Sequence, residues 1–385
     1  ASHPSERIMI LTTMLLMQGQ VLAPEDTGEE GRRILPNIFS ADDHLDLFGR
    51  FQQDFAYVDD ETFGTKDGSE VRRARLGVGG NLAEGLDWKM EVDFASFDGG
   101  GAAFTDAYLK FSNLPVGTLK VGHFKEPFSL NELTSSRFIT FTERADTFAP
   151  SRNIGVMASD NNDNLTWQVG AFWEAGKTGN LETDNDTALT GRVVFRPYME
   201  DGGKRLAHVG LSISLREAES GAYGAGTRGG VHLLDGMLAA GAIAADDGLT
   251  LIGLEGAIQE GPISGQFEFV QADGDDDSLS SWYLQGGYFL TGESRAYKAS
   301  SGAWDRVKPN TPYGSNGNGA WEVAARLGAI DLSEAAADNE ATMIALALNW
   351  YLTNYTRVGF DIYSADSDAF DDDVLAAVIR FGLDF

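Results

Sequence analysis

Basic side chains and hydroxyl groups gather in one irregular stretch of the chain, Glu126–Asn153. Arg137, Arg144 and Arg152 lie there among Ser and Thr residues. Guanidinium groups and hydroxyls donate hydrogen bonds that suit the oxygens of small anions. Phe, Ile and Leu side chains in the same stretch argue against disorder, because they need something to pack on. We therefore expect an ordered loop that offers anion contacts.

Residues for covalent or metal chemistry are missing or poorly spaced. The chain has no cysteine, which excludes disulfides, thiol catalysis and thiolate metal sites. Its five histidines show no metal-ligand spacing, and no GxSxG or phosphate-loop motif occurs. Carboxylates on one strand face, such as Glu91 and Asp93, are interpreted as the lining of a water-filled space. We predict that the protein is not an enzyme and that it holds no cofactor and no metal.

The charge of the chain narrows its partners. A formal net charge of −29 argues against nucleic acid as a partner, because phosphates would be repelled. Acidic residues cluster in runs such as Asp273–Asp277 and Asp371–Asp373. We interpret these runs as solvated loops, with divalent-cation binding as the alternative.

The elements that would position such residues are strands. Leu86–Phe94 alternates strictly, with apolar residues on one face and charged residues on the other. In a soluble sandwich the charged face would meet outside water, whereas in a membrane barrel it would face a water-filled lumen. One strand does not decide between these two folds.

Repetition of the pattern favours the barrel. Segments of about ten residues with aromatic residues near their ends recur along the chain, and short connections alternate with long polar ones. This predicts an all-β fold, a 16-stranded antiparallel transmembrane β-barrel. The expected strands begin near residues 45, 71, 86, 103, 117, 154, 165, 187, 205, 249, 263, 280, 319, 341, 355 and 374.

Three segments stand out within this barrel. The alternation stops at 126–153, which we predict to be an external loop folded inward to constrict the bore. The alanine-rich segment Val231–Ala245 is expected to be part of a long external loop with a helical turn. The last strand alternates up to Phe385, which resembles the signal that delivers outer-membrane proteins to the barrel-assembly machinery; the alternative is an edge strand of a soluble sheet.

The N-terminal part needs a separate interpretation. Residues 1–23 include the apolar run Ile8–Met17, which is too short to span a bilayer as a helix. We predict a signal-peptide remnant there, with a retained N-terminal helix as the alternative. Residues 24–44 are expected to form a periplasmic linker, and 45–385 the barrel.

Strand parity also bears on the basic residues Val71–Leu76. With Leu76 and Val78 facing outward, Arg73 would face inward and Arg72 outward. A β-bulge would allow both arginines to reach the lumen.

Several motifs resemble the phosphate-selective porin O/P family. The resemblance covers roughly residues 45–385, nearly the whole expected barrel. It rests on VRRARLGVGG at 71–80, LTGESRAYK at 290–298, DRVKP at 305–309, GAWEV at 319–323, LNWY at 348–351 and the terminal Phe. Members of this family are sixteen-stranded, trimeric outer-membrane channels whose third external loop folds inward, which agrees with the pattern above.

The resemblance implies a set of solute contacts. An arginine pair, loop serines, an aspartate and a lysine of a long periplasmic turn bind phosphate in the family. The matching positions are Arg72, Arg73, Ser135, Ser136, Asp106 and Lys308, with Lys89 and Lys298 in a basic vestibule. Arg137 is added as a neighbouring anion contact.

Two departures from the family pattern affect selectivity. Glu132 stands where members have a loop lysine, and an anion there should repel phosphate. An arginine-rich segment is reduced to Arg228, which we assign to the vestibule.

The sequence therefore predicts an outer-membrane porin for passive diffusion of small hydrophilic solutes, with a phosphate or anion preference. Its partners would be outer-membrane lipid and lipopolysaccharide, two further copies in a homotrimer, and small anions. The alternatives are a general or cation-leaning porin, and a structural outer-membrane protein that binds partners or divalent cations.

Overall fold

A computed structural model describes residues 45–59, 66–95, 102–175, 186–218, 221–234, 238–314, 316–336, 339–368 and 373–385. The expectations for residues 1–23 and 24–44 lie outside this part of the chain. No helix among the described residues is long and apolar enough to cross a membrane.

Large apolar side chains lie on the exposed outer face of the sheet. In β18 (Glu340–Tyr351), Ile344 and Leu346 are 53% and 55% exposed, whereas Ala345 and Ala347 are buried. Apolar side chains recur on the outer face of the other strands, while arginines and carboxylates are buried on the inner face. A soluble sandwich would show the reverse, so this arrangement identifies a barrel with a lipid-facing exterior.

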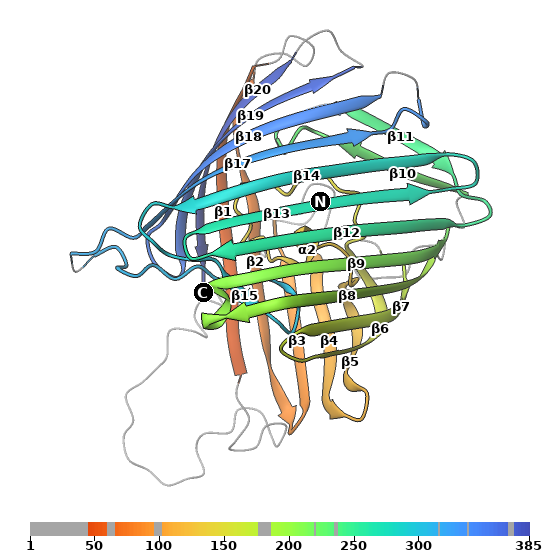
Figure 1. Cartoon of the computed structure of the whole chain (residues 1–385), viewed down its shortest axis with the longest axis horizontal. Coiled ribbons are helices and arrows are strands. Elements are labelled where there is room, and N and C mark those ends of the chain that lie inside the picture. The colour runs from red at the N-terminus through yellow and green to blue at the C-terminus, as the bar shows by residue number, and fades with distance from the viewer. Residues whose placement is uncertain are drawn as a thin grey trace, which may run out of the picture. The chain divides into compact units, whose positions relative to one another are not determined.

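Sixteen antiparallel strands of the described chain close into one barrel (Figure 1). Every strand start except that of β2 lies within two residues of its predicted position. In spatial order the strands are β1 (Leu45–Asp59), β2 (Lys66–Ala83), β3 (Leu86–Asp93), β4 (Ala103–Leu114), β5 (Gly117–Lys125), β6 (Arg152–Asn161), β7 (Leu165–Trp173), β8 (Thr187–Glu200), β9 (Arg205–Glu217), β12 (Leu249–Glu260), β13 (Ile263–Asp273), β14 (Ser278–Phe289), β17 (Ala320–Asp331), β18, β19 (Thr356–Ser367) and β20 (Val374–Asp384).

The barrel closes between its first and last strands. β1 pairs with β20 from Arg50 opposite Asp384 to Asp59 opposite Leu375. Gly49 and Phe385 exchange backbone hydrogen bonds of 3.0 and 3.1 Å. Closure satisfies strand groups that would otherwise be unpaired in lipid, so the soluble edge-strand alternative for β20 does not hold.

The segment between β5 and β6, residues 126–151, is called the L3 loop. It contains one short helix, α2 (Leu130–Leu133), and buries Phe128, Leu130 and Phe141 completely. Side chains of the opposite wall hold its backbone: Asn349 donates to Thr140 O at 2.9 Å and Arg326 to Glu143 O at 3.0 Å. Because the loop has no strand partner, these bonds satisfy carbonyls that would otherwise be orphaned. The predicted inward loop is confirmed.

A second segment enters the lumen from the end with short turns. The long connection between β14 and β17 forms the hairpin β15 (Ala296–Lys298) and β16 (Ala303–Asp305). Arg192 donates to Ser301 O and Gly302 O at 2.9 and 2.7 Å, and Trp304 donates to Gln266 at 2.7 Å. The hairpin therefore fills the lumen beside β8, β9, β12 and β13.

One prediction for the external loops is wrong in part. The segment Val231–Ala245 lies in the long connection between β9 and β12, as expected, but residues 239–244 form no helical turn. They form the strand β11 (Ala239–Ala244), which pairs with β10 (Ala222–Thr227). The Asn339 side chain accepts from Ala240 N and donates to Ala240 O. This pairing satisfies the backbone of β11 and overrides the helix propensity of its alanines. Between β8 and β9 the chain makes a single 3₁₀ turn, η1 (Asp201–Gly203).

Candidate solute-binding site

A cavity, which we call the main cavity, lies between the L3 loop and the wall of β1 to β6, and Ser301 of the β15–β16 hairpin also lines it. Its empty volume, open solvent included, is about 1220 Å³, and most of its lining comes from β1 to β6 and L3. Ten basic side chains line it: Arg50, Arg72, Arg73, Arg75, Lys89, Lys120, Lys125, Arg137, Arg144 and Arg152. Only Asp106 and Glu132 bring carboxylates to the lining among the described residues. The surface of the cavity is therefore rich in cationic donors.

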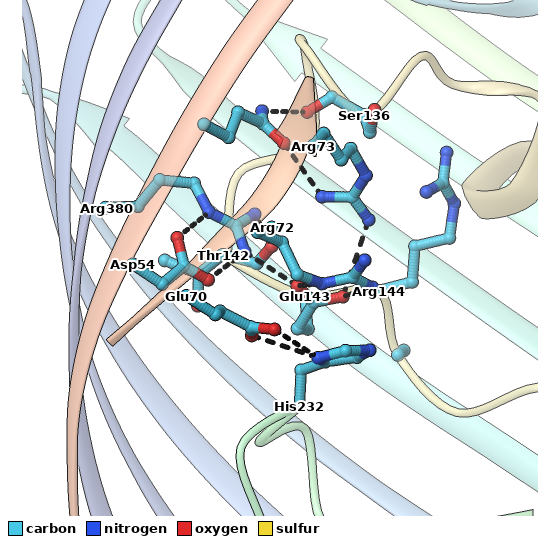
Figure 2. Close-up of polar contacts among 12 residues, drawn as sticks. Asp54, Glu70, Arg72, Arg73, Ser136, Thr142, Glu143, Arg144, His232 and Arg380 are labelled. Atoms are coloured by element: carbon cyan, nitrogen blue, oxygen red, sulfur yellow. Dashed lines mark hydrogen bonds and ion pairs between the residues drawn. The ribbon is translucent and has the colours of Figure 1, made fainter. Parts of the chain in front are cut away.

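Arg72 and Arg73 both point to one carboxylate of the L3 loop. The register between β1 and β2 shifts at Gln52 and Gln53, which leaves Arg72 as the extra residue of a β-bulge. Glu143 accepts from Arg72 Nε at 2.8 Å and approaches Arg73 Nη2 at 3.6 Å (Figure 2). The predicted bulge thus brings both arginines together.

Glu143 joins a third arginine to this pair. Arg380 of β20 contacts the same carboxylate at 2.7 Å and also pairs with Asp54 (Figure 2). Burial alone would raise the pKa of the Glu143 carboxyl, but the three arginines outweigh it and hold that pKa well below its usual range. An internal anion therefore occupies the arginine pair.

The loop serines contact an arginine that the sequence argument overlooked. Arg50 of β1 donates from Nη1 to Ser136 Oγ at 2.6 Å and lies 3.5 Å from Ser135 Oγ. Its Nη2 donates to Glu91 at 3.2 Å. The inward parity that Arg50 shares with Gln52 on β1 was the available signal. The structure thus brings Ser135 and Ser136 to the cavity beside a further strand arginine.

Asp106 and Lys89 form a connected group on β3 and β4. Lys89 Nζ lies 2.6 Å from Asp106 Oδ2, and Arg152 Nε lies 2.9 Å from Asp106 Oδ1. Both oxygens of Asp106 are therefore engaged by cations of the wall.

Glu132 is compensated by two neighbours in the same way. Its carboxylate lies 2.8 Å from Lys125 Nζ and 3.1 Å from Arg144 Nε. Burial by itself would raise the pKa of Glu132, but the charges of Lys125 and Arg144 lower it to about 2. The repulsion of phosphate expected from Glu132 is reduced, because Lys125 and Arg144 compensate its charge. The sequence did not predict these two ion pairs.

Two cations of the cavity are less compensated. Within the described chain Lys120 has no ion-pair partner; its ammonium lies 4.7 Å from the centre of the Tyr108 ring and 5.1 Å from that of Phe124. Arg137 has one distant partner, Asp384, at 3.8 Å. Aromatic faces stabilise a cation without neutralising it, so these positions keep a positive potential.

The remaining predicted residues lie outside the main cavity. Lys298 and Lys308 are exposed on the connection between β14 and β17. Arg228 is exposed after β10 and donates to His232 O at 3.1 Å. The structure does not bring these three residues to Arg72 and Arg73.

The described residues contain no group of three or more His, Cys, Asp or Glu side chains that could hold a metal ion. What the geometry offers is a polar cavity with fixed guanidinium, ammonium and hydroxyl donors. Linings of this kind bind and conduct small solutes in channels.

Comparison with known proteins agrees with this chemistry. The family described as phosphate-selective porin O and P matches residues 46–385. Porin O of Pseudomonas aeruginosa is 27% identical over 378 residues, which cover 84% of this chain and 83% of the relative.

Solved porin structures have the same fold. The anion-selective porin of Comamonas acidovorans superposes with a TM-score of 0.55 at 15% identity, over 89% of this chain and 100% of that one. OmpT of Vibrio cholerae in a trimer form gives a TM-score of 0.50 at 14% identity, over 88% of this chain and 99% of that one. At these identities the likeness concerns the fold.

Proposed function

Because the chain belongs to the phosphate-selective porin O and P family and is an outer-membrane porin, we propose that it conducts small oxyanions in preference to cations. Phosphate is the solute class that fits the donors best. The relatives are channels, and the pore chemistry described above needs no catalytic step.

The observation that carries the proposal is the excess of cations around the main cavity. Ten basic and two acidic side chains line it. Glu91, Asp93 and Glu143 lie behind the lining and compensate part of the charge. Low-dielectric walls focus the remaining positive potential on the passage, which raises the local concentration of anions.

Donor geometry supports an oxyanion over chloride alone. Guanidinium groups present paired N–H donors that match two oxygens of one phosphate, and serine hydroxyls add further donors. Arg50, Ser135 and Ser136 bring one guanidinium and two hydroxyls to one point of the cavity, where Glu91 accepts from Nη2 of the same arginine.

The internal carboxylates limit the strength of this preference. Glu143 engages Arg72 and Arg73, and Glu132 engages Lys125 and Arg144. We therefore propose contacts weaker than those of an open arginine pair, with Lys120, Arg137 and the Arg50–Ser136 group as the principal ones. Conduction is compatible with weak contacts, because a solute must also leave.

A general or cation-leaning pore is the second candidate. The net charge of −29 favours it, since acidic segments near the outer mouth would attract cations before they meet the cavity. The potential at the narrow part of the passage decides between the two.

Reversal potentials of single channels in a KCl gradient test the proposal. We expect the sign of an anion-selective channel and a reduction of chloride current by millimolar phosphate. A cation-selective reversal potential would contradict the proposal and favour the second candidate. A barrel closed to ions and solutes would favour a structural role.

We also propose that the protein works as a homotrimer in contact with outer-membrane lipid and lipopolysaccharide. The apolar outer faces of the strands support lipid contact, and the family resemblance implies the trimer. Native mass spectrometry of the detergent-extracted protein would show three copies, and a monomer alone would contradict this assembly.

A further inference from the structure

A second cavity lies at the short-turn end of the barrel, below the L3 loop. Its empty volume, open solvent included, is about 630 Å³, and residues of the 352–356 turn, of the connection after β16, of β20 and of the tip of L3 line it. Arg50, Ser136 and Arg137 line this cavity and the main cavity alike. Short turns mark the periplasmic end of outer-membrane barrels, so we call it the periplasmic cavity.

One carboxylate lies among the arginines of the periplasmic cavity. Asp384 of β20 contacts Arg306 Nη2 and lies 3.8 Å from Arg137 Nη1. Its backbone N–H donates to Tyr355 O at 2.8 Å, which fixes the residue at the turn between β18 and β19. Among the described residues that line this cavity, Asp384 supplies the single carboxylate, whereas arginine occurs five times.

Aromatic rings orient the two guanidinium groups. Those of Arg137 and Arg306 lie 5.5 and 5.2 Å from the centre of the Phe138 ring, and that of Arg306 lies 5.1 Å from the Tyr355 ring. Arg306 also donates to Asn354 O. A ring contact does not neutralise a guanidinium; Arg306 donates its Nη groups to Asn354 O and Asp384, whereas among the described residues Arg137 has Asp384, at 3.8 Å, as its one ion-pair partner. Two guanidinium groups therefore share one carboxylate at this cavity.

The geometry points to a second anion site in the periplasmic cavity, at which the Asp384 carboxylate competes with the passing solute for Arg306 and Arg137. The solute class is a phosphate-sized oxyanion. This inference rests on the proposed anion conduction and adds to it a place where the solute pauses before it leaves the barrel.

A tethered competitor suits a conduction site. A carboxylate presents to a guanidinium the same pair of oxygens that a phosphate presents. Because Asp384 is fixed beside the arginines, its effective concentration is high and an external anion is displaced quickly. A site that binds and releases in this way prevents an exit cavity rich in arginine from trapping the anion.

Continuity between the cavities supports the order of events. Arg50 donates to Ser136 Oγ at 2.6 Å at their common border, and Arg137 follows Ser136 in the chain. Arg137 thus belongs to both cavities, so the same side chain that contacts a solute in the main cavity also faces Asp384.

The test measures how phosphate reduces chloride current when it is added to the periplasmic side. Removal of the competitor in Asp384→Asn should lower the inhibitory phosphate concentration about tenfold, a change of about 1.4 kcal/mol. Arg306→Gln should raise the inhibitory phosphate concentration by at least about threefold, because one of the two guanidinium groups that contact the anion is lost. Phosphate added from the opposite side of the membrane should give a smaller difference between the variants and the wild type.

Glu260→Gln is the matched control. Glu260 is an exposed carboxylate at the same end of the barrel, paired with Arg205 and outside both cavities. The substitution changes the net charge as Asp384→Asn does and should leave the inhibition unchanged. If Asp384→Asn fails to assemble, Arg306→Gln alone carries the test, with heat-modifiable gel mobility as the check on folding.

Two different failures are distinguishable. A wild-type channel without anion preference contradicts the proposed function. If the channel is anion-selective but phosphate inhibits Arg306→Gln, and Asp384→Asn where it folds, as it inhibits the wild type, the second site is overturned. The proposed function then still stands.

Discussion

Glu143 binds Arg72 through both of its oxygens, with Nε–Oε1 and Nη2–Oε2 distances of 2.8 and 3.0 Å. The L3 loop therefore places its own carboxylate on the strand arginines that the family resemblance assigns to the solute. We therefore expect the selectivity of this pore to depend on how completely such internal carboxylates compensate the cations.

Removal of that carboxylate should strengthen anion binding. Glu143→Gln leaves Arg72 and Arg73 without their ionic partner, while Arg380 keeps Asp54. Because a buried charge pair is replaced by free cations, we expect the concentration of phosphate that halves chloride current to fall roughly tenfold.

Single-channel recording in planar bilayers measures this effect. Glu217→Gln, an exposed carboxylate at the outer end of β9, serves as the control for net charge. Equal inhibition in the Glu143 variant and the wild type would show that the arginine pair does not contact the solute.

Glu132 offers a graded version of the same experiment. Glu132→Gln frees Lys125 and Arg144 and should increase the chloride-over-potassium permeability ratio. Glu132→Lys would instead place three cations together, so we expect it to weaken the docking of L3 and to increase current noise. A Glu132→Gln channel that becomes less anion-selective would contradict the compensation described here.

Lys120 should contribute more to selectivity than its paired neighbour on the same wall. Lys120→Met removes a cation that has no ion-pair partner in the described chain, and should lower the permeability ratio by roughly two- to fivefold. Lys110 pairs with Asp87 at 2.7 Å near the end of β4, so Lys110→Met is the matched control. Identical shifts in the two variants would argue that position along the pore, rather than compensation, sets the effect.

The pH dependence of stability should report Asp146 of the L3 loop. Burial raises the pKa of Asp146 to about 6, although Thr227 donates a hydrogen bond to it. The folded protein then binds a proton that the unfolded chain, with the ordinary value of 3.8, does not bind in that interval. Stability should therefore fall as the pH rises from about 4 to about 6, by up to about 3 kcal/mol.

Asp146→Asn removes this proton uptake. Urea unfolding in detergent micelles, followed by tryptophan fluorescence, should show a flatter pH profile for the variant and a higher stability above pH 7. A variant with the same slope as the wild type would place the titration elsewhere.

The β15–β16 hairpin should control the width of the lumen. Trp304 is 3% exposed, and its ring lies 4.3 Å from the Arg295 guanidinium. Truncation to alanine at such a position costs about 3–5 kcal/mol, enough to undock a short hairpin. We expect Trp304→Ala to raise the single-channel conductance, whereas Trp321→Ala on the outward parity of β17 should not. An unchanged conductance would show that the hairpin does not narrow the conducting path.

The sequence by itself determined the barrel. Alternation with a period of two is a local property, so β3 and β18 could be placed from their residues alone. The alternation of short and long connections indicated the two ends of the barrel. The stop in alternation at Glu126 likewise marked the inward loop. The β10–β11 hairpin escaped prediction because its alanines carry no strand pattern and pair only through tertiary contacts.

Only the tertiary structure decided the charge of the passage. Arg72 and Glu143 are 71 residues apart, and Arg306 and Asp384 are 78 apart, so no local pattern links them. Their pairing depends on the path of L3 and of the β14–β17 connection through the lumen. The residue types predicted anion contacts. The position of each carboxylate in three dimensions decides which cations remain available to a solute.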